Sequence, residues 1–143
     1  MESKYRYGDD YPKQCPPSTA NCPIGGVLFR VCKNELVKNG KLNSDNFIPA
    51  WETPRRNFPP VQECSAKALS FFDTVKGVKD LLRKHPKIGN TVIKIELNRY
   101  CGVIEKTGDK GHYSLWDLKE PCIVDAIEGN WKEVYLDEQV VSQ

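Results

Sequence analysis

The chain has 143 residues, of which 39% are hydrophobic and 28% are charged, and its formal net charge is +2. These values fit a single globular domain with one hydrophobic core. No apolar run is long enough to cross a membrane, and the N-terminus lacks the apolar stretch of a signal peptide. We therefore expect a cytoplasmic protein without a membrane partner.

The charges are distributed unevenly along the chain. Lys and Arg outnumber the acidic residues over residues 1–110, and acidic residues outnumber Lys and Arg over residues 111–143. Either the two parts lie against each other in the fold, or the basic part attracts an anion such as a nucleotide or nucleic acid. Because the basic residues are scattered rather than clustered, the first alternative is favoured.

The six cysteines include no Cys-x-x-Cys pair, and the closest two, Cys15 and Cys22, are spaced too widely for a zinc knuckle. The cytosol keeps thiols reduced, so we interpret all six as reduced thiols that are buried or incidental. No metal site is predicted.

The composition divides the chain into three parts. Residues 1–24 are rich in Tyr, Asp, Pro and Ser and are predicted to form an extended N-terminal arm, ordered by packing on the rest. A single domain is expected over residues 25–137, followed by a frayed tail over residues 138–143.

The front of the domain contains one clear strand. Residues 27–32 are β-branched and aromatic and follow a Gly-Gly break, which is typical of a strand. The Asn39-Gly40 pair then indicates a hairpin or tight turn. A long proline-containing connection follows over residues 49–62, and we expect Trp51 and Phe58 to anchor it.

The main helix is predicted from Asp73, a good N-cap, to about His85, which precedes Pro86. Its apolar stripe has helical spacing and comprises Val75, Val78, Leu81 and Leu82.

The second half of the chain is predicted to be mostly strands. A strand over residues 93–97 precedes a hairpin of residues 102–106 and 112–118, and two further strands are expected at 123–127 and 131–136. The predicted fold is therefore α+β: a mostly antiparallel sheet with one main helix packed on it.

The segment from Gly111 to Trp116 offers the clearest candidate chemistry. Side chains alternate along a strand, so His112, Ser114 and Trp116 would share one face and Tyr113 would point the other way. An imidazole, a hydroxyl and an indole together suit acid–base work or the binding of a polar planar ligand. The alternative is that His112 has a purely structural role.

Two further candidates precede this strand. Arg30 lies within the first strand, where it either grips a phosphate or is solvated or paired with a carboxylate such as Glu96. Ser70 is expected just before the helix, where backbone N–H groups favour an anion. In the simpler interpretation, Phe71 and its neighbour belong to the core and Asp73 caps the helix.

An early Leu-Phe-Arg strand, a Ser-Phe-Phe segment before a helix, and a polar residue on a later strand resemble small bacterial toxin domains of the ADP-ribosyltransferase-like and RES types. In those families the first-strand Arg or His grips NAD and a following Ser or aromatic lines the nicotinamide pocket, while a later Glu or His completes the site. The resemblance implies Arg30, Ser70 and Phe71 in these roles, with His112 in the late position and NAD as the substrate. The Glu-x-Glu pair of the first group is absent from this chain.

Two functions follow from these features. The first is an intracellular effector, a nucleotide-directed transferase or hydrolase acting on NAD or RNA: Arg30 would bind phosphate, His112 would assist, and Tyr113 or Trp116 would stack on a base. The second is a non-catalytic interaction module whose aromatic arm docks on a protein partner. The first hypothesis requires Arg30 and His112 to meet in one pocket.

The sequence contains no Walker, dinucleotide-binding, zinc-protease, nucleophile-elbow or EF-hand motif that would indicate another chemistry.

Overall fold

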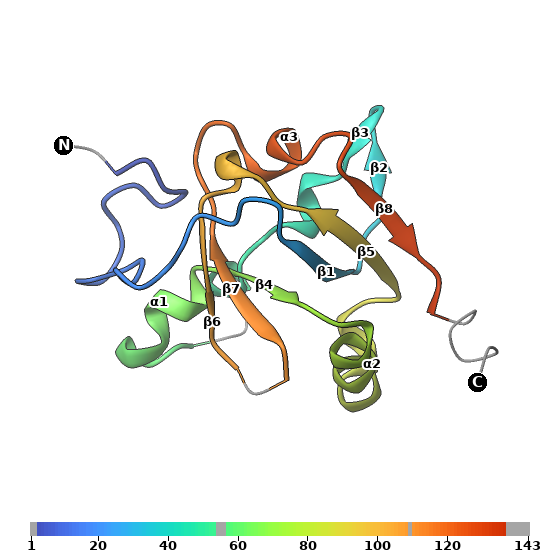
Figure 1. Cartoon of the computed structure of the whole chain (residues 1–143). Coiled ribbons are helices and arrows are strands. Elements are labelled where there is room, and N and C mark those ends of the chain that lie inside the picture. The colour runs from blue at the N-terminus through green and yellow to red at the C-terminus, as the bar shows by residue number, and fades with distance from the viewer. Residues whose placement is uncertain (1–2, 54–56, 109, 137–143) are drawn as a thin grey trace.

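A six-stranded antiparallel sheet forms the centre of the computed structural model, which describes residues 3–53, 57–108 and 110–136 (Figure 1). The strand order is β6-β7-β4-β1-β5-β8, and every neighbouring pair is antiparallel. The predicted α+β fold is thereby confirmed. The strands of this sheet are β1 (Val27–Cys32), β4 (Leu69–Phe72), β5 (Thr91–Glu96), β6 (Val103–Lys106), β7 (His112–Trp116) and β8 (Trp131–Val134).

Alternation along the strands gives the sheet two apolar faces. Leu28, Phe71, Ile93 and Leu115 point to the side that holds the larger hydrophobic cluster, which we call the core face. The opposite side is called the helix face, because its cluster contains residues of helix α2.

The core face is covered by short elements rather than by a long helix. Hairpin β2 (Val37–Lys38) and β3 (Lys41–Leu42), the 3₁₀ turn η1 (Ser44–Asn46) and the one-turn helix α3 (Ile123–Ala126) lie over it (Figure 1). Asn39 and Gly40 both have positive φ, as the predicted hairpin turn requires. Buried Phe47, which follows η1, packs into the same cluster.

Helix α2 (Val75–Lys84) covers part of the helix face, where Val78 packs with Phe72 and Val92. The predicted N-cap was wrong by one residue, because the side chain of Thr74 accepts the bond from Gly77 N–H. Asp73 instead donates its N–H to the carbonyl of Gly111, and so continues the β4–β7 pairing.

Two further predictions of secondary structure were wrong. Within the predicted strand 123–127, Ile123–Ala126 form helix α3 and Ile127 caps it. Ile123 and Ile127 are both buried, and their spacing suits one helical turn as well as a strand. Ser70 and Phe71 do not lead directly into the helix but lie within β4, a central strand of the sheet. Helix α1 (Glu63–Ala66) precedes this strand.

The arm, blue in Figure 1, is fastened to the body at several points. A disulfide joins Cys15 to Cys64 of helix α1, and β-bridges pair Tyr5 with Leu118 and Asn21 with Ile104. The prediction that all six cysteines are reduced is therefore wrong for this pair. The other four cysteines are free thiols. In the described part of the chain, no helix has the length and apolar character needed to span a bilayer.

Candidate functional site

The structure divides the predicted site residues between the two faces of the sheet. Arg30 neighbours Phe71, because Phe29 pairs with Phe72, and Phe71 in turn lies opposite Tyr113. Arg30, Phe71 and Tyr113 thus form one row across β1, β4 and β7 on the core face. The remaining candidates alternate to the helix face, namely Ser70, His112, Ser114 and Trp116. The single pocket with both Arg30 and His112 that the enzyme hypothesis requires is not formed.

His112 takes part in a local polar network at the helix face. Its Nδ1 lies 2.9 Å from Oγ1 of Thr107, which is 2.8 Å from Oγ of Ser114. The ring stands edge-on to Phe72, with a centroid distance of 5.3 Å. Burial lowers the pKa of His112, which favours a neutral imidazole at pH 7. These contacts fit a structural role that ties the ends of the β6–β7 hairpin together.

Trp116 and Ser114 are both buried. The indole N–H of Trp116 donates to the carbonyl of Cys64, so this ring anchors helix α1 to the sheet. A buried indole with its N–H already bonded offers no face for stacking on a base.

Arg30 is held in place on the core face. Its Nε donates to the carbonyl of Asn46 at 2.9 Å, and its Nη1 donates to the carbonyl of Ser70 at 2.7 Å. The guanidinium also lies over the rings of Phe47 and Phe71, at 5.2 and 5.4 Å from their centroids. Burial lowers the pKa of Arg30 to about 10, so the group stays charged at pH 7.

The third guanidinium nitrogen of Arg30, Nη2, makes no hydrogen bond to a described residue. Within the described ranges, no buried side-chain nitrogen or oxygen lacks a partner. It follows that Nη2 reaches the surface, where it can donate to a ligand.

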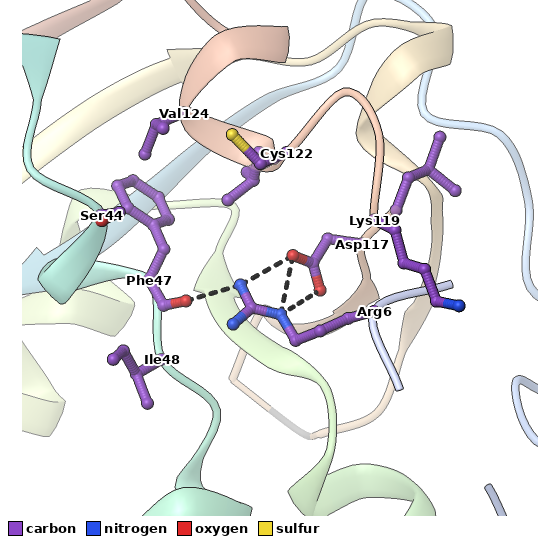
Figure 2. Close-up of a pocket in the computed structure, with 10 residues that line it drawn as sticks. Arg6, Ser44, Phe47, Ile48, Asp117, Lys119, Cys122 and Val124 are labelled. Atoms are coloured by element: carbon purple, nitrogen blue, oxygen red, sulfur yellow. Dashed lines mark hydrogen bonds and ion pairs between the residues drawn. The ribbon is translucent and has the colours of Figure 1, made fainter. Parts of the chain in front are cut away.

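A second arginine, Arg6 of the arm, approaches the same region (Figure 2). Its Nε and Nη2 donate to the carboxylate of Asp117 at 3.0 and 2.8 Å, and Nη2 also donates to the carbonyl of Phe47 at 2.7 Å. The Asp117 side chain is only 2% exposed, against 26% for Arg6. Burial raises the pKa of Asp117, and the bonds to Arg6 together with the nearby charge of Arg30 oppose that shift.

These groups border a cavity of about 420 Å³, which we call the Arg6–Asp117 pocket. Figure 2 shows the ion pair on one side of it and the ring of Phe47 on another. Three separate segments line the pocket. They contribute Arg6 of the arm; Ser44, Phe47 and Ile48 from η1 and the residues after it; and Asp117, Leu118, Lys119, Cys122, Ile123 and Val124 between β7 and α3.

Sequence reasoning missed Arg6, Phe47 and Asp117. The three lie in segments with no motif and no periodic pattern, and only the docking of the arm brings Arg6 to Asp117. The predicted strand 112–118 included Asp117, whereas β7 ends at Trp116, so no local signal placed Asp117 at a strand end.

Two aromatic residues of the arm, Tyr7 and Tyr11, contact a buried lysine of the domain. The ammonium group of Lys67, which is fully buried, lies 4.6 Å from the ring centroid of Trp51 and between 5 and 6 Å from those of Tyr7 and Tyr11. It also donates to the carboxylate of Glu63 at 2.7 Å. Two aromatic rings of the arm, Tyr7 and Tyr11, thus contact a cation of the same molecule.

Comparison of the chain with models of protein families, with curated proteins and with solved structures finds no match. The described residues also contain no cluster of His, Cys, Asp and Glu that would hold a metal ion.

Proposed function

We propose that the protein is a small effector that binds a nucleotide of the NAD type at the Arg6–Asp117 pocket, with Arg30 next to Phe47, one of its lining residues. The observation that carries the proposal is the convergence of two arginines and one buried carboxylate beside the ring of Phe47. Guanidinium groups bind phosphate, carboxylates accept bonds from ribose hydroxyls, and apolar lining residues such as Ile48 and Val124 pack against a base.

The charge balance of the site suits an anion. Arg6, Arg30 and the lining residue Lys119 supply three positive charges. The carboxylate of Asp117 and that of Glu52, which lies 3.9 Å from Arg6, supply two negative charges. One positive charge is left to attract a phosphate. We assign this phosphate to Nη2 of Arg30, because the other two nitrogens of that guanidinium are bonded to carbonyl groups.

The size of the pocket agrees with a ligand of this class. Its volume of about 420 Å³ lies in the range of about 300–1,000 Å³ that is usual for small-molecule sites. Apolar walls from Phe47, Ile48 and Val124 stand beside the polar groups, as a partly aromatic, partly anionic ligand requires.

The resemblance to ADP-ribosyltransferase-like domains supports the same ligand. It places a first-strand arginine together with a Ser or aromatic from the next segment, and Arg30 contacts both the carbonyl of Ser70 and the ring of Phe71. His112 does not reach this side of the sheet. In our proposal, Asp117 therefore takes the role of the Glu or His that completes the site in those families.

The test is isothermal titration of the purified protein with NAD, comparing wild type with Arg30→Gln and Asp117→Asn. Loss of one charge-assisted hydrogen bond is expected to weaken binding about tenfold or more. His112→Gln, which changes a polar side chain on the opposite face, is the matched control and should bind NAD like the wild type. Thermal melting of each variant establishes that it is folded.

Two results would overturn the proposal. One is a folded wild-type protein that binds no NAD at millimolar concentration. The other is a folded Arg30→Gln variant that binds NAD as tightly as the wild type, while His112→Gln loses binding.

A further inference from the structure

A second depression, of about 370 Å³, lies between helix α2 and the turn of the β6–β7 hairpin. It lies near the His112 end of β7, whereas the Arg6–Asp117 pocket lies beyond the Trp116 end of the same strand. The two are therefore independent sites. It is lined by Asp73, Thr74, Lys76, Gly77, Asp80, Lys106, Lys110 and Gly111.

Among the charged residues that line this depression, lysines outnumber aspartates by three to two. Lys76, Lys106 and Lys110 line it, and Lys84 of the same helix lies against Lys110. None of the four forms an ion pair with a described carboxylate. Of the two aspartates in the lining, Asp80 is paired with Arg83, and Asp73 places its carboxylate beside Gly111. Together with Lys84, four lysines stand against these two carboxylates. The depression therefore presents a surplus of positive charge.

Lys84 and Lys110 show that this charge is concentrated. Their ammonium groups are close enough that Lys110 lowers the pKa of Lys84. Two like charges held together favour an anion that binds between them.

The backbone keeps the hairpin in a fixed position against the helix. A Cβ atom at Gly77 would lie 2.8 Å from the carbonyl oxygen of Lys110, and Gly111 has a φ of +77° beside the carboxylate of Asp73. The N–H of Asp73 also donates to the carbonyl of Gly111. Lysines from the hairpin and from the helix are thus held on opposite sides of one depression.

We propose that this lysine depression binds the phosphate backbone of a nucleic acid duplex. The volume exceeds what a single phosphate would fill, and three lining lysines from two elements fit a ligand with several negative charges. No aromatic side chain of the described residues lines the depression, so the contacts are to phosphates without stacking on bases. Binding is accordingly independent of sequence and favours a duplex, whose bases are already stacked.

The test measures the binding of a fluorescein-labelled 20-base-pair DNA duplex by anisotropy over a series of salt concentrations. The double variant Lys106→Gln/Lys110→Gln removes two positive charges from the depression. The control Lys13→Gln/Lys33→Gln removes two exposed lysines that also form no ion pair with a described residue. Both variants have the same net charge.

For the wild type, the logarithm of the binding constant should fall linearly with the logarithm of the salt concentration. The depression variant should reduce that slope by about two, and the control variant should leave it unchanged. Equal slopes for both variants, or no binding of the duplex by the wild type at low salt, would overturn the proposal. Poly-glutamate of matched charge is included, and binding of this polymer in preference to the duplex would assign the depression to an acidic protein instead.

Discussion

Arg6 and Arg30 donate to consecutive carbonyl oxygens of one loop, those of Phe47 and Asn46. One arginine comes from the arm and the other from a central strand, so the loop is gripped from two sides. The carboxylate of Asp117 interacts electrostatically with both guanidinium groups. The charges of the arm and of the sheet therefore meet at this loop. The arm is consequently part of the candidate site and not an appendage to it.

Asp117→Asn is expected to lower the free energy of unfolding by about 2 kcal/mol, because Arg6 loses its ionised acceptor in a half-buried place. Chemical denaturation measures the change. Asp125→Asn removes an exposed carboxylate that lies 3.7 Å from Lys41, and this control should cost less than about 1 kcal/mol. Equal losses for the two variants would contradict a special role for Asp117.

The Cys15–Cys64 disulfide closes a loop with a sequence separation of 49. Replacing both cysteines with alanine should therefore lower the free energy of unfolding by about 3 kcal/mol, and should make the arm more sensitive to protease. Cys22→Ala, at an exposed free thiol, is the control. An arm that is equally resistant to protease in all three proteins would show that its other contacts suffice.

Lys67→Met removes the buried charge and keeps most of the side-chain volume. Loss of the aromatic contacts and of the bond to Glu63 is expected to cost about 2 kcal/mol and to loosen the arm. Urea unfolding and proteolysis of the arm measure the two effects. Lys132→Met, at an exposed lysine of β8, should change neither quantity.

Gly77→Ala should destabilise the protein even though alanine is the better helix former by about 1 kcal/mol. The new Cβ would lie 2.8 Å from a backbone carbonyl of the hairpin and 3.2 Å from the ring of Phe72. We expect a net loss of about 2 kcal/mol in thermal or chemical unfolding. At Gly26 a Cβ has its nearest neighbour at 3.8 Å, so Gly26→Ala should be tolerated. A Gly77→Ala variant that is more stable than wild type would show that the hairpin can shift.

His112 is expected to make stability depend on pH. Burial lowers its pKa below the ordinary value of 6.5, so the unfolded chain binds a proton more readily than the folded one. The free energy of unfolding should therefore rise as pH increases through the range just below 6.5 and level off above it. His112→Gln should remove this rise, while His85→Gln, at an exposed position, should retain it. An unchanged pH profile for His112→Gln would contradict the assignment.

Several elements could be predicted because their signals are local. Strand β1, the Asn39-Gly40 turn and the β6–β7 hairpin follow from side-chain alternation and from turn residues that tolerate positive φ. Helix α2 follows from its apolar stripe and from the proline after it. Residues 123–127 were predicted wrongly because two isoleucines four positions apart satisfy either a strand or a single helical turn.

The candidate site was predictable only in part. The sequence identified Arg30, Phe71 and Tyr113, which the sheet places in one row, but it grouped them with His112. Which strands are neighbours, and in which register, depends on contacts between residues far apart in the chain. The face that two residues on different strands share therefore cannot be derived from either strand alone.

The sequence by itself determined the fold class, the positions of most strands and the charged and aromatic residues available for chemistry, since these depend on periodicity and composition. Only the tertiary structure decided that Arg6 meets Asp117, that Cys15 pairs with Cys64, and that Lys67 lies inside a cage of aromatic rings. Each of these contacts joins the arm to a distant segment. Such contacts form when the whole arm packs against the finished domain, and no local sequence pattern encodes that packing.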